Sequence, residues 1–271
     1  LTQTVTAVGC SDDGLGFGLM RRRLHVLLAL ARSDLRIRYG RGGWQIVNWL
    51  VNPFALVGVY LLLRVILSRA DEGAALSIAC AVVPFQIVIL VAESSMSAVS
   101  LREPVLLNRP FDRMLIPPSS VLTEALAFGA SFLLFPLTMA FAGIGPAWSL
   151  LWLPLVVAVT LVFALGVAWP ATLLGVWFPT TKVFVSQGLR VLFFAAPGVV
   201  ALAEVSDGVR RWIVFNPLTG LFESFRHVFL YSAAPRLEHL LYPAIVGLVS
   251  CVVFMPIFAR EQRHFAKLVR S

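Results

Sequence analysis

Residues 125–181, ALAFGASFLLFPLTMAFAGIGPAWSLLWLPLVVAVTLVFALGVAWPATLLGVWFPTT, contain no Asp, Glu, Lys or Arg. This stretch is too long for one buried helix and long enough for two crossings of a bilayer, because each crossing needs about 20 apolar residues. Near its middle, Gly143-Ile144-Gly145-Pro146 combines two glycines with a proline, which favours a turn. The stretch therefore predicts two membrane helices joined by a tight, uncharged hairpin in an integral membrane protein.

The composition agrees with this class of protein. Hydrophobic residues make up 59% of the chain and charged residues 13%, and the mean hydropathy is +0.86. These values exclude an ordinary soluble domain of this length. The formal net charge is +8, but the basic residues gather between apolar stretches. Anionic lipid headgroups account for them better than nucleic acid, so no nucleic-acid partner is expected.

We predict an all-α integral membrane protein with six transmembrane helices in a domain that covers residues 42–259. The predicted spans are approximately residues 44–67, 73–92, 119–143, 150–178, 183–203 and 239–259. The other predicted segments are a cytoplasmic lead-in (1–20), an amphipathic interface helix (21–41), a coupling loop (93–118), an external re-entrant region (204–238) and a cytoplasmic tail (260–271).

The segment 21–41 has the pattern of a helix in the membrane interface. Its apolar face comprises Leu24, Leu27, Leu28, Ala31 and Leu35. Its basic side comprises Arg21, Arg22, His25, Arg32 and Arg36. A basic amphipathic helix lies in the plane of the interface with its apolar face down. A solvated helix of a cytoplasmic domain is the alternative, but too little chain lies outside the membrane to build a core.

The external region 204–238 is predicted to contain a short helix that does not cross the membrane. Asn216-Pro217 combines an N-cap residue with a proline at the first helical position, which favours a helix start. The expected helix, residues 218–230, is too short to span the bilayer. Glu223 and Arg226 are three residues apart and can pair on one side of it.

Six spans place both termini on the same side of the membrane. With the termini inside, the cytoplasmic segments hold fifteen Lys and Arg residues and the external segments five. This excess predicts that both termini are cytoplasmic.

The motifs of common catalytic sites are absent. The chain has no GxxxxGK[ST], HExxH or GxSxG sequence, and its four histidines share no metal-ligand spacing. We therefore expect a chain without catalytic residues, metal or cofactor. Arg190 is predicted about 12 Å beyond Lys182 along a helix, well inside the membrane. It either lines a pore or contacts a headgroup, or it is a snorkelling or structurally paired arginine.

The predicted coupling loop mixes both charge signs with apolar residues. Residues 102–113 read REPVLLNRPFDR, and a solvated loop rarely exposes Leu106, Leu107 and Phe111 together. The loop either docks onto a cytoplasmic partner or anchors in the interface.

At these residues the chain resembles the membrane subunit of ABC-2 type exporters, and most closely their polysaccharide and polyol-phosphate branch. The resemblance is carried by residues 32–39 (RSDLRIRY), 107–110 (LNRP) and 216–220 (NPLTG) with Glu223 and Arg226, in the order and topology of that family. Two features depart from the pattern: Ser33 interrupts the usual Arg-Asp pair, and residues 41–44 (RGGW) replace a more usual run.

The resemblance implies a homodimer that forms one channel and carries two copies of a separate ATPase subunit. ATP and Mg²⁺ would bind to that partner. The implied substrate is a polyprenyl-diphosphate-linked glycan of the O-antigen, teichoic acid or galactan type. It would be exported across the cytoplasmic membrane, and ATP binding would act on the coupling loop and the interface helix.

The resemblance also implies roles for individual residues. ATPase coupling is assigned to Arg102, Glu103, Leu106, Leu107, Arg109, Asp112, Arg113 and Lys182. Contact with the diphosphate headgroup at the interface helix is assigned to Arg32, Asp34, Arg36, Arg38 and Tyr39, and simple binding of the basic residues to anionic lipid is the alternative. An external gate is assigned to Phe215, Asn216, Pro217, Glu223 and Arg226. Candidates for the channel wall are Phe54, Tyr60, Trp169, Arg190 and Phe193, for which packing within the bilayer is the alternative.

Three other functions fit the sequence. The chain could be an ABC-2 exporter of a small amphiphile such as a drug or a lipid. It could be a multispan lipid-linked transferase, which would need acids or histidines on a membrane face. It could also be a scaffold that only recruits an ATPase.

Overall fold

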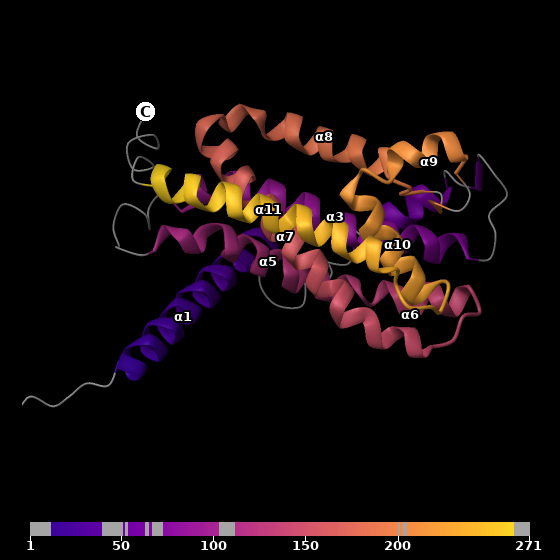
Figure 1. Ribbon diagram of the computed structural model, residues 1–271, viewed down its shortest axis with the longest axis horizontal. Helices are drawn as coiled ribbons and strands as arrows, with labels where there is room; N and C mark the ends of the chain where they lie inside the picture. Colours follow the sequence, from indigo (N-terminus) through magenta and orange to yellow (C-terminus); the bar gives the residue numbers. More distant parts are fainter. Residues whose placement is uncertain are drawn as a thin grey trace, which may run out of the picture.

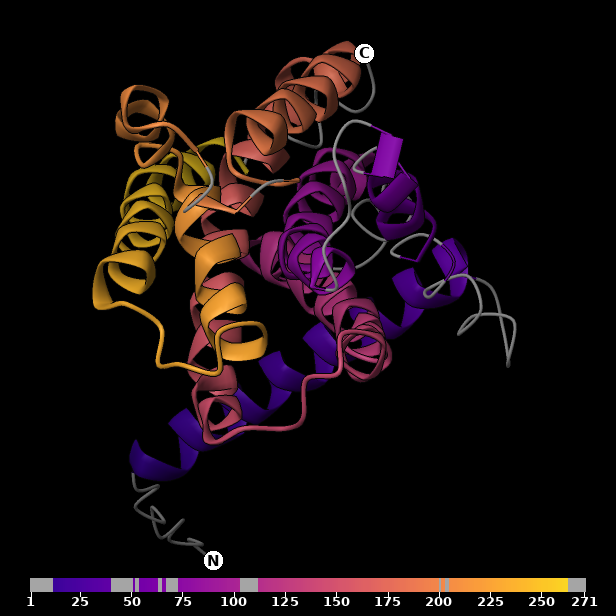
Figure 2. The same cartoon turned by 90° about the vertical axis from the view of Figure 1, so that its right-hand side faces the viewer.

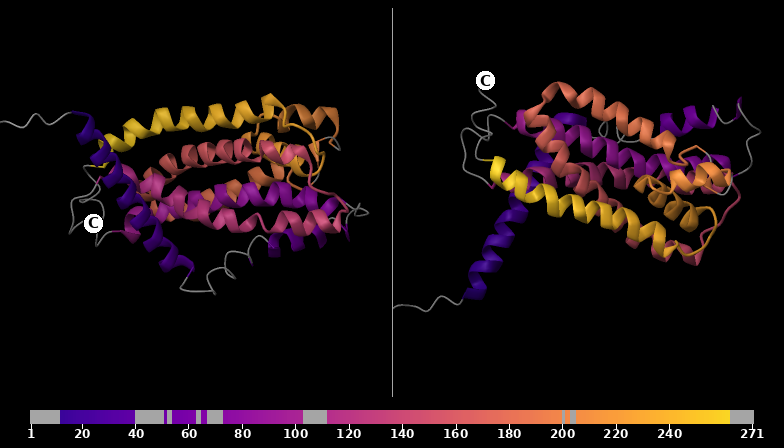
Figure 3. Two further views of the ribbon diagram at one scale, coloured as in Figure 1. Left: turned by 90° about the horizontal axis from the view of Figure 1, so that it is seen from below. Right: turned by 45° about the horizontal axis from the view of Figure 1, so that its top comes forward.

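The structure is a computed structural model. It describes residues 12–39, 51, 54–62, 65–66, 73–102, 112–199, 201–202 and 205–262, and the regular elements within these ranges are all helical. Four long helical stretches run side by side along the length of the molecule, and a fifth long helix, α1, crosses one end of them obliquely (Figures 1 and 3).

The helices are bounded as follows. They are α1 (Asp12–Tyr39), α3 (Ala74–Leu101), α5 (Ile116–Ser131), α6 (Leu134–Phe141), α7 (Leu153–Trp177), α8 (Lys182–Ala195), α9 (Asp207–Ile213), α10 (Pro217–Phe229) and α11 (Leu237–Glu261). Short 3₁₀ turns precede α5, α7 and α8, at Arg113–Leu115, Trp148–Trp152 and Pro179–Thr181.

Four helical stretches are long and apolar enough to cross a membrane. They are Ala74–Leu101, Arg113–Phe141, Trp148–Trp177 and Leu237–Glu261, and they match the second, third, fourth and sixth predicted spans. The structure thus agrees with an all-α, multi-pass membrane protein. The first predicted span falls largely outside the described residues. The predicted fifth span, 183–203, is represented by α8, whose 14 residues end at Ala195. The count of six spans stays a prediction.

Three element boundaries differ from the predicted ones. Helix α1 begins at Asp12 rather than at residue 21, and acidic residues in a first turn favour such a start. Helix α3 continues past residue 92 to Leu101, and within this extension the hydroxyls of Ser94 and Ser97 donate to carbonyls of the same helix. The predicted span 119–143 breaks at residues 132–133. Pro136 has no N–H to donate to the carbonyl four residues earlier, and its ring clashes with that carbonyl.

Helix α3 forms the centre of the bundle. It contacts α5, α6, α7, α8 and α10. In its most apolar stretch of 18 residues, 89% of the residues are buried within the chain. The corresponding share is only 17% for α11, whose outward face carries exposed side chains such as Leu248 and Val252. An exposed apolar face of this extent suits lipid or a partner subunit.

Glycines let the long helices approach to backbone contact. A Cβ atom built on Gly175 of α7 would collide with the carbonyl oxygen of Met96 in α3. A Cβ on Gly166 of α7 would lie 2.5 Å from the carbonyl oxygen of Gly247 in α11. The Ser250 hydroxyl donates across the same α7–α11 crossing to the Gly166 carbonyl (2.6 Å). Small residues at such crossings are typical of membrane helix packing.

The bundle has two different ends. Helix α1 lies at the end where α3 and α11 finish, and we call this the α1 end. The short helices α9 and α10 lie at the opposite end, beside the start of α11, which we call the α10 end (Figure 1). Seen along the bundle, α1 runs across the direction of the long helices instead of joining them (Figure 2).

The crossing of α3 and α7 gives a test of this packing. Gly175→Ala should lower the melting temperature of the purified protein in detergent, because overpacking of this kind costs about 1–3 kcal/mol. Gly129→Ala is the matched control, since a Cβ at this exposed position of α5 has no atom within 4 Å. The α3–α7 packing described here would be wrong if both variants melted at the wild-type temperature.

Candidate functional site

A buried ion pair lies at the α10 end of the bundle. The Arg226 side chain is fully buried, and its Nη1 donates to Glu223 Oε1 at 2.8 Å. Its Nε donates to the Ser77 hydroxyl of α3 (3.1 Å) and its Nη2 to the Gly198 carbonyl (3.4 Å). Glu223 Oε1 also accepts from the Leu202 backbone N–H (3.0 Å). We call these five residues the α10 network. It ties α10 both to α3 and to the segment that follows α8.

The start of α10 is fixed by its own sequence. Asn216 caps the helix, since its side-chain oxygen accepts from the Leu218 N–H (3.1 Å), and Pro217 occupies the first turn. The side-chain Nδ2 of Asn216 donates to the Leu192 carbonyl in the last turn of α8 (2.7 Å). The predicted helix start is therefore confirmed, and the cap also attaches α8 to α10.

Aromatic rings fill the space around α10. Phe135 of α6 stacks on Phe229 with ring centroids 3.9 Å apart and lies 5.9 Å from Phe225. On the other side, Phe222 contacts Phe193 of α8 at 5.6 Å. A Cβ added to Gly198 would lie 2.7 Å from the Phe193 ring, so the chain after α8 also fits closely. These contacts leave α10 little freedom to move alone.

The structure brings four of the five predicted gate residues together. Asn216, Pro217, Glu223 and Arg226 belong to α10 or its cap, and the predicted pairing of Glu223 with Arg226 is confirmed. The fifth, Phe215, has its side chain 71% exposed. Its backbone carbonyl accepts from the Tyr242 hydroxyl at the start of α11 (2.7 Å).

Charged residues also cluster at the α1 end. Arg102, at the end of α3, forms a buried ion pair with Asp34 of α1. Arg23 of α1 pairs with Asp112 at 3.2 Å. Arg113 donates to the carbonyl of Gln262 at the end of α11, and Lys182 of α8 donates to the Ser97 hydroxyl of α3 (2.8 Å). Five helices are thus linked by polar contacts at this end.

The predicted coupling residues divide into two groups. Arg102, Asp112, Arg113 and Lys182 all lie at the α1 end. The remaining four lie outside the described residues; they are Glu103, Leu106, Leu107 and Arg109.

The predicted headgroup residues of α1 lie in different surroundings. Arg32 and Arg36 are exposed. Asp34 is buried, and its carboxylate pairs with Arg102 inside the protein. The backbone of Arg38 and Tyr39 belongs to α1, but their side chains fall outside the described residues. Of the predicted apolar face, Ala31 and Leu35 are buried, while Leu24 and Leu28 are exposed.

The channel candidates do not share one surface. Trp169 packs on Phe258 of α11 and is buried, and Phe193 is fully buried among Tyr60, Phe85 and Phe222. Phe54 and Tyr60 are half-buried. Arg190 is exposed on α8. Burial of the two large aromatic side chains favours their packing role in this conformation.

Several site residues carried no clear signal in the sequence. Ser77 contacts Arg226 from 149 positions away, and Asp34 contacts Arg102 from 68 positions away. Neither pair forms a local pattern. Within the residues that the structure describes, no three of His, Cys, Asp and Glu are placed to hold a metal ion.

Comparison with known proteins places the chain beside O-antigen export permeases. Two proteins of Klebsiella pneumoniae named "O-antigen export system permease protein RfbA" are 24% and 23% identical to it over 250 and 249 residues. A Myxococcus xanthus protein of the same name is 27% identical over 249 residues. Each alignment covers 90% of this chain and 95% of the relative. No family model matches the chain. The resemblance to ABC-2 type polysaccharide exporters is thereby confirmed.

The α10 network predicts a marked difference between single and double replacements. Arg226→Ala should destabilise the protein by about 3–5 kcal/mol, because it leaves the Glu223 carboxylate buried without its cation. Replacing both with leucine removes both buried charges, so it should recover most of the melting temperature in detergent.

The exposed pair Arg236–Glu238, 3.7 Å apart, supplies the control. Glu238→Gln should change stability by less than about 1 kcal/mol. A double leucine variant less stable than Arg226→Ala would show that the network is not the source of the effect.

Proposed function

We propose that the chain is the permease subunit of an ABC transporter that exports a polysaccharide across the cytoplasmic membrane. The observation that carries the proposal is the similarity to three O-antigen export permeases over 90% of the chain. Four apolar helices of spanning length support a multi-pass membrane location. The family relationship supports a separate ATPase subunit, and the substrate would be a glycan on a polyprenyl diphosphate carrier.

In this proposal the α1 end is cytoplasmic and meets the ATPase. Basic residues concentrate there, as the positive-inside rule requires. The buried pair Asp34–Arg102 attaches α1 to α3, and Arg113 attaches the start of α5 to the end of α11. A partner that pushes on α1 or on the adjoining loop therefore also pushes on the long helices.

Helix α3 offers a direct connection between the two ends. It carries Arg102 just past its C-terminus and Ser77 in its first turn, so its 28 residues span about 42 Å. Ser77 holds Arg226 of α10. Movement of α3 at the cytoplasmic end would thus reach the α10 network, which supports a role for α10 in an external gate.

The channel would form between two copies of the chain. Helix α8 exposes Gln187, Gly188 and Arg190 among apolar residues such as Phe184 and Val191. A charged side chain facing lipid inside the bilayer is costly, so such residues face water or protein. This favours a position for α8 on an aqueous path, with a second subunit opposite.

Copurification and reconstitution test the proposal. The chain should copurify with the ATPase encoded beside it, as a complex with two copies of each subunit. Its ATP hydrolysis should rise with a lipid-linked glycan. A complex that responds instead to small amphiphiles would contradict the glycan substrate, and absence of any ATPase partner would overturn the transporter.

The Asp34–Arg102 pair gives a prediction for coupling. Asp34→Asn should lower glycan export per ATP hydrolysed by about tenfold, since coupling free energies of 1–3 kcal/mol correspond to 5–150-fold effects. Ser33→Ala is the matched control, because Ser33 is the exposed neighbour of Asp34 on α1. An unchanged ratio of export to hydrolysis in Asp34→Asn, measured in proteoliposomes, would remove the pair from the coupling path.

A further inference from the structure

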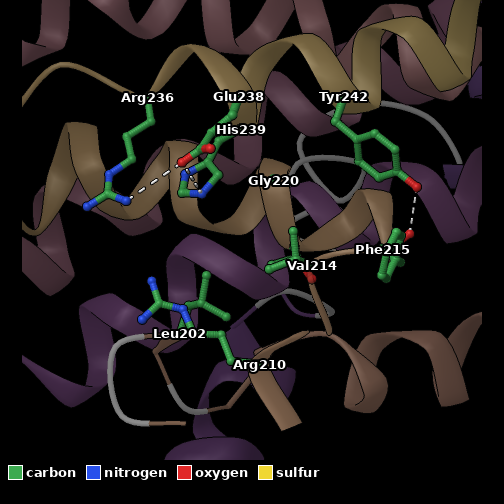
Figure 4. A pocket seen from close by; sticks show the side chains of 10 residues that line it. Leu202, Arg210, Val214, Phe215, Gly220, Arg236, Glu238, His239 and Tyr242 are labelled. Carbon is green, nitrogen blue, oxygen red and sulfur yellow. Dashed lines mark hydrogen bonds and ion pairs between the residues drawn. The ribbon is translucent and has the colours of Figure 1, made fainter. Parts of the chain in front are cut away.

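A cavity of about 400 Å³ opens between α9, α10 and α11 at the α10 end. Its volume lies in the roughly 300–1,000 Å³ range of small-molecule sites. Figure 4 shows Arg236 and Tyr242 reaching into it from α11, and Arg210 from α9 on the opposite wall. The Tyr242–Phe215 hydrogen bond closes one side of the cavity. The cavity is therefore formed by three elements that are already held in place.

One part of the cavity is cationic. Arg236 from α11 and Arg210 from α9 approach it from opposite walls, and both guanidinium groups lie toward the left of the view (Figure 4). The Arg210 side chain is half-buried and forms no hydrogen bond or ion pair with any described residue. Among the described residues, the guanidinium of Arg236 has only the long contact of 3.7 Å with Glu238. Two arginines beside a single carboxylate leave an excess positive charge, and planar guanidinium groups match phosphate oxygens in geometry and charge.

The other part of the cavity is apolar. Leu202, Val214 and Phe215 line it, and Phe215 lies on the side away from the two guanidinium groups (Figure 4). Next to it on α9, the Trp212 side chain is 79% exposed. Exposed tryptophan and arginine on one short helix are typical of the boundary between headgroups and hydrocarbon. A ligand that fits both walls has an anionic head and an apolar body.

We propose that this cavity binds the phosphate group of a lipid at the outer surface of the membrane. The phosphate lies between Arg210 and Arg236, and the first apolar atoms of the lipid lie on Val214 and Phe215. The assignment rests on the proposed function for its placement at the external surface. The same chemistry is offered by a bilayer phospholipid and by a diphosphate-linked lipid, so the two sources have to be separated by experiment.

Binding to the purified full-length complex tests the proposal. The complex, delipidated in dodecyl maltoside, is titrated with short-chain phosphatidylglycerol, farnesyl diphosphate, inorganic phosphate and phosphate-free octyl glucoside, and bound ligand is counted by native mass spectrometry. Wild type should bind at least one phosphate-bearing lipid more tightly than the other two ligands. Preference for phosphatidylglycerol identifies a bilayer lipid, and preference for farnesyl diphosphate identifies a diphosphate-linked lipid.

Two variants assign that binding to the cavity. Arg210→Ala with Arg236→Ala should lower the affinity at least about tenfold, because charge-assisted hydrogen bonds are lost. Arg211→Ala is the matched control, since Arg211 is exposed on α9 and does not line the cavity. It should bind like wild type. Replacing both arginines with lysine, which keeps the charge, should retain part of the affinity.

Three results would overturn the proposal. The first is equal lipid affinity of wild type and the double alanine variant. The second is a loss of lipid affinity in Arg211→Ala as large as in the double alanine variant. The third is binding of octyl glucoside or inorganic phosphate as tight as that of the lipids. The assay needs no ATP hydrolysis or export. Failure of a wild-type complex that exports glycan to bind either lipid would contradict only the cavity assignment, whereas absence of an ATPase partner would contradict only the transporter.

Discussion

A fully buried guanidinium in an apolar helix bundle constrains the whole α10 end of the molecule. An isolated charge there would cost several kcal/mol, so each donor of Arg226 needs a partner. The protein supplies one from the same helix, one from α3 and one from the chain after α8. Since two of these partners come from other segments, α10 cannot leave its place without breaking hydrogen bonds of a buried charge. The position of the short helices follows from this requirement.

Helix α3 has the complementary role at the centre. It is buried along most of its length, contacts most of the other helices and carries a polar anchor near each end. At one end Arg102 is paired with Asp34, and at the other Ser77 is bonded to Arg226. The location of these two anchors explains how two sites at opposite ends of a membrane domain can belong to one mechanical unit.

Hydropathy and local helix signals predicted a large part of this structure. The uncharged stretch 125–181 predicted the hairpin before α7, and Asn216-Pro217 predicted the start of α10, because both effects act between residues close in sequence. The Glu223–Arg226 pair was predictable for the same reason. The predicted ends of α3 and α8 were less accurate, because α3 continues through the half-buried Glu93 while the turn at residues 196–198 shortened α8.

Contacts between distant segments could not be predicted from one sequence. Nothing near Asp34 indicates that it meets Arg102, and nothing near Gly175 indicates that its backbone touches Met96. The cavity beside α9 belongs to the same class, because Arg210 and Arg236 come together only once α9 and α11 are placed. The sequence showed which residue types were unusual for a membrane protein, whereas their partners depend on the packing of the helices.

The glycine contacts between α7, α3 and α11 have a further consequence for motion. Where backbones touch, one helix cannot slide or rotate past the other without a collision, because no side chain is present to change its rotamer. The three helices therefore shift as one rigid unit, so a displacement of α3 carries α7 and α11 with it.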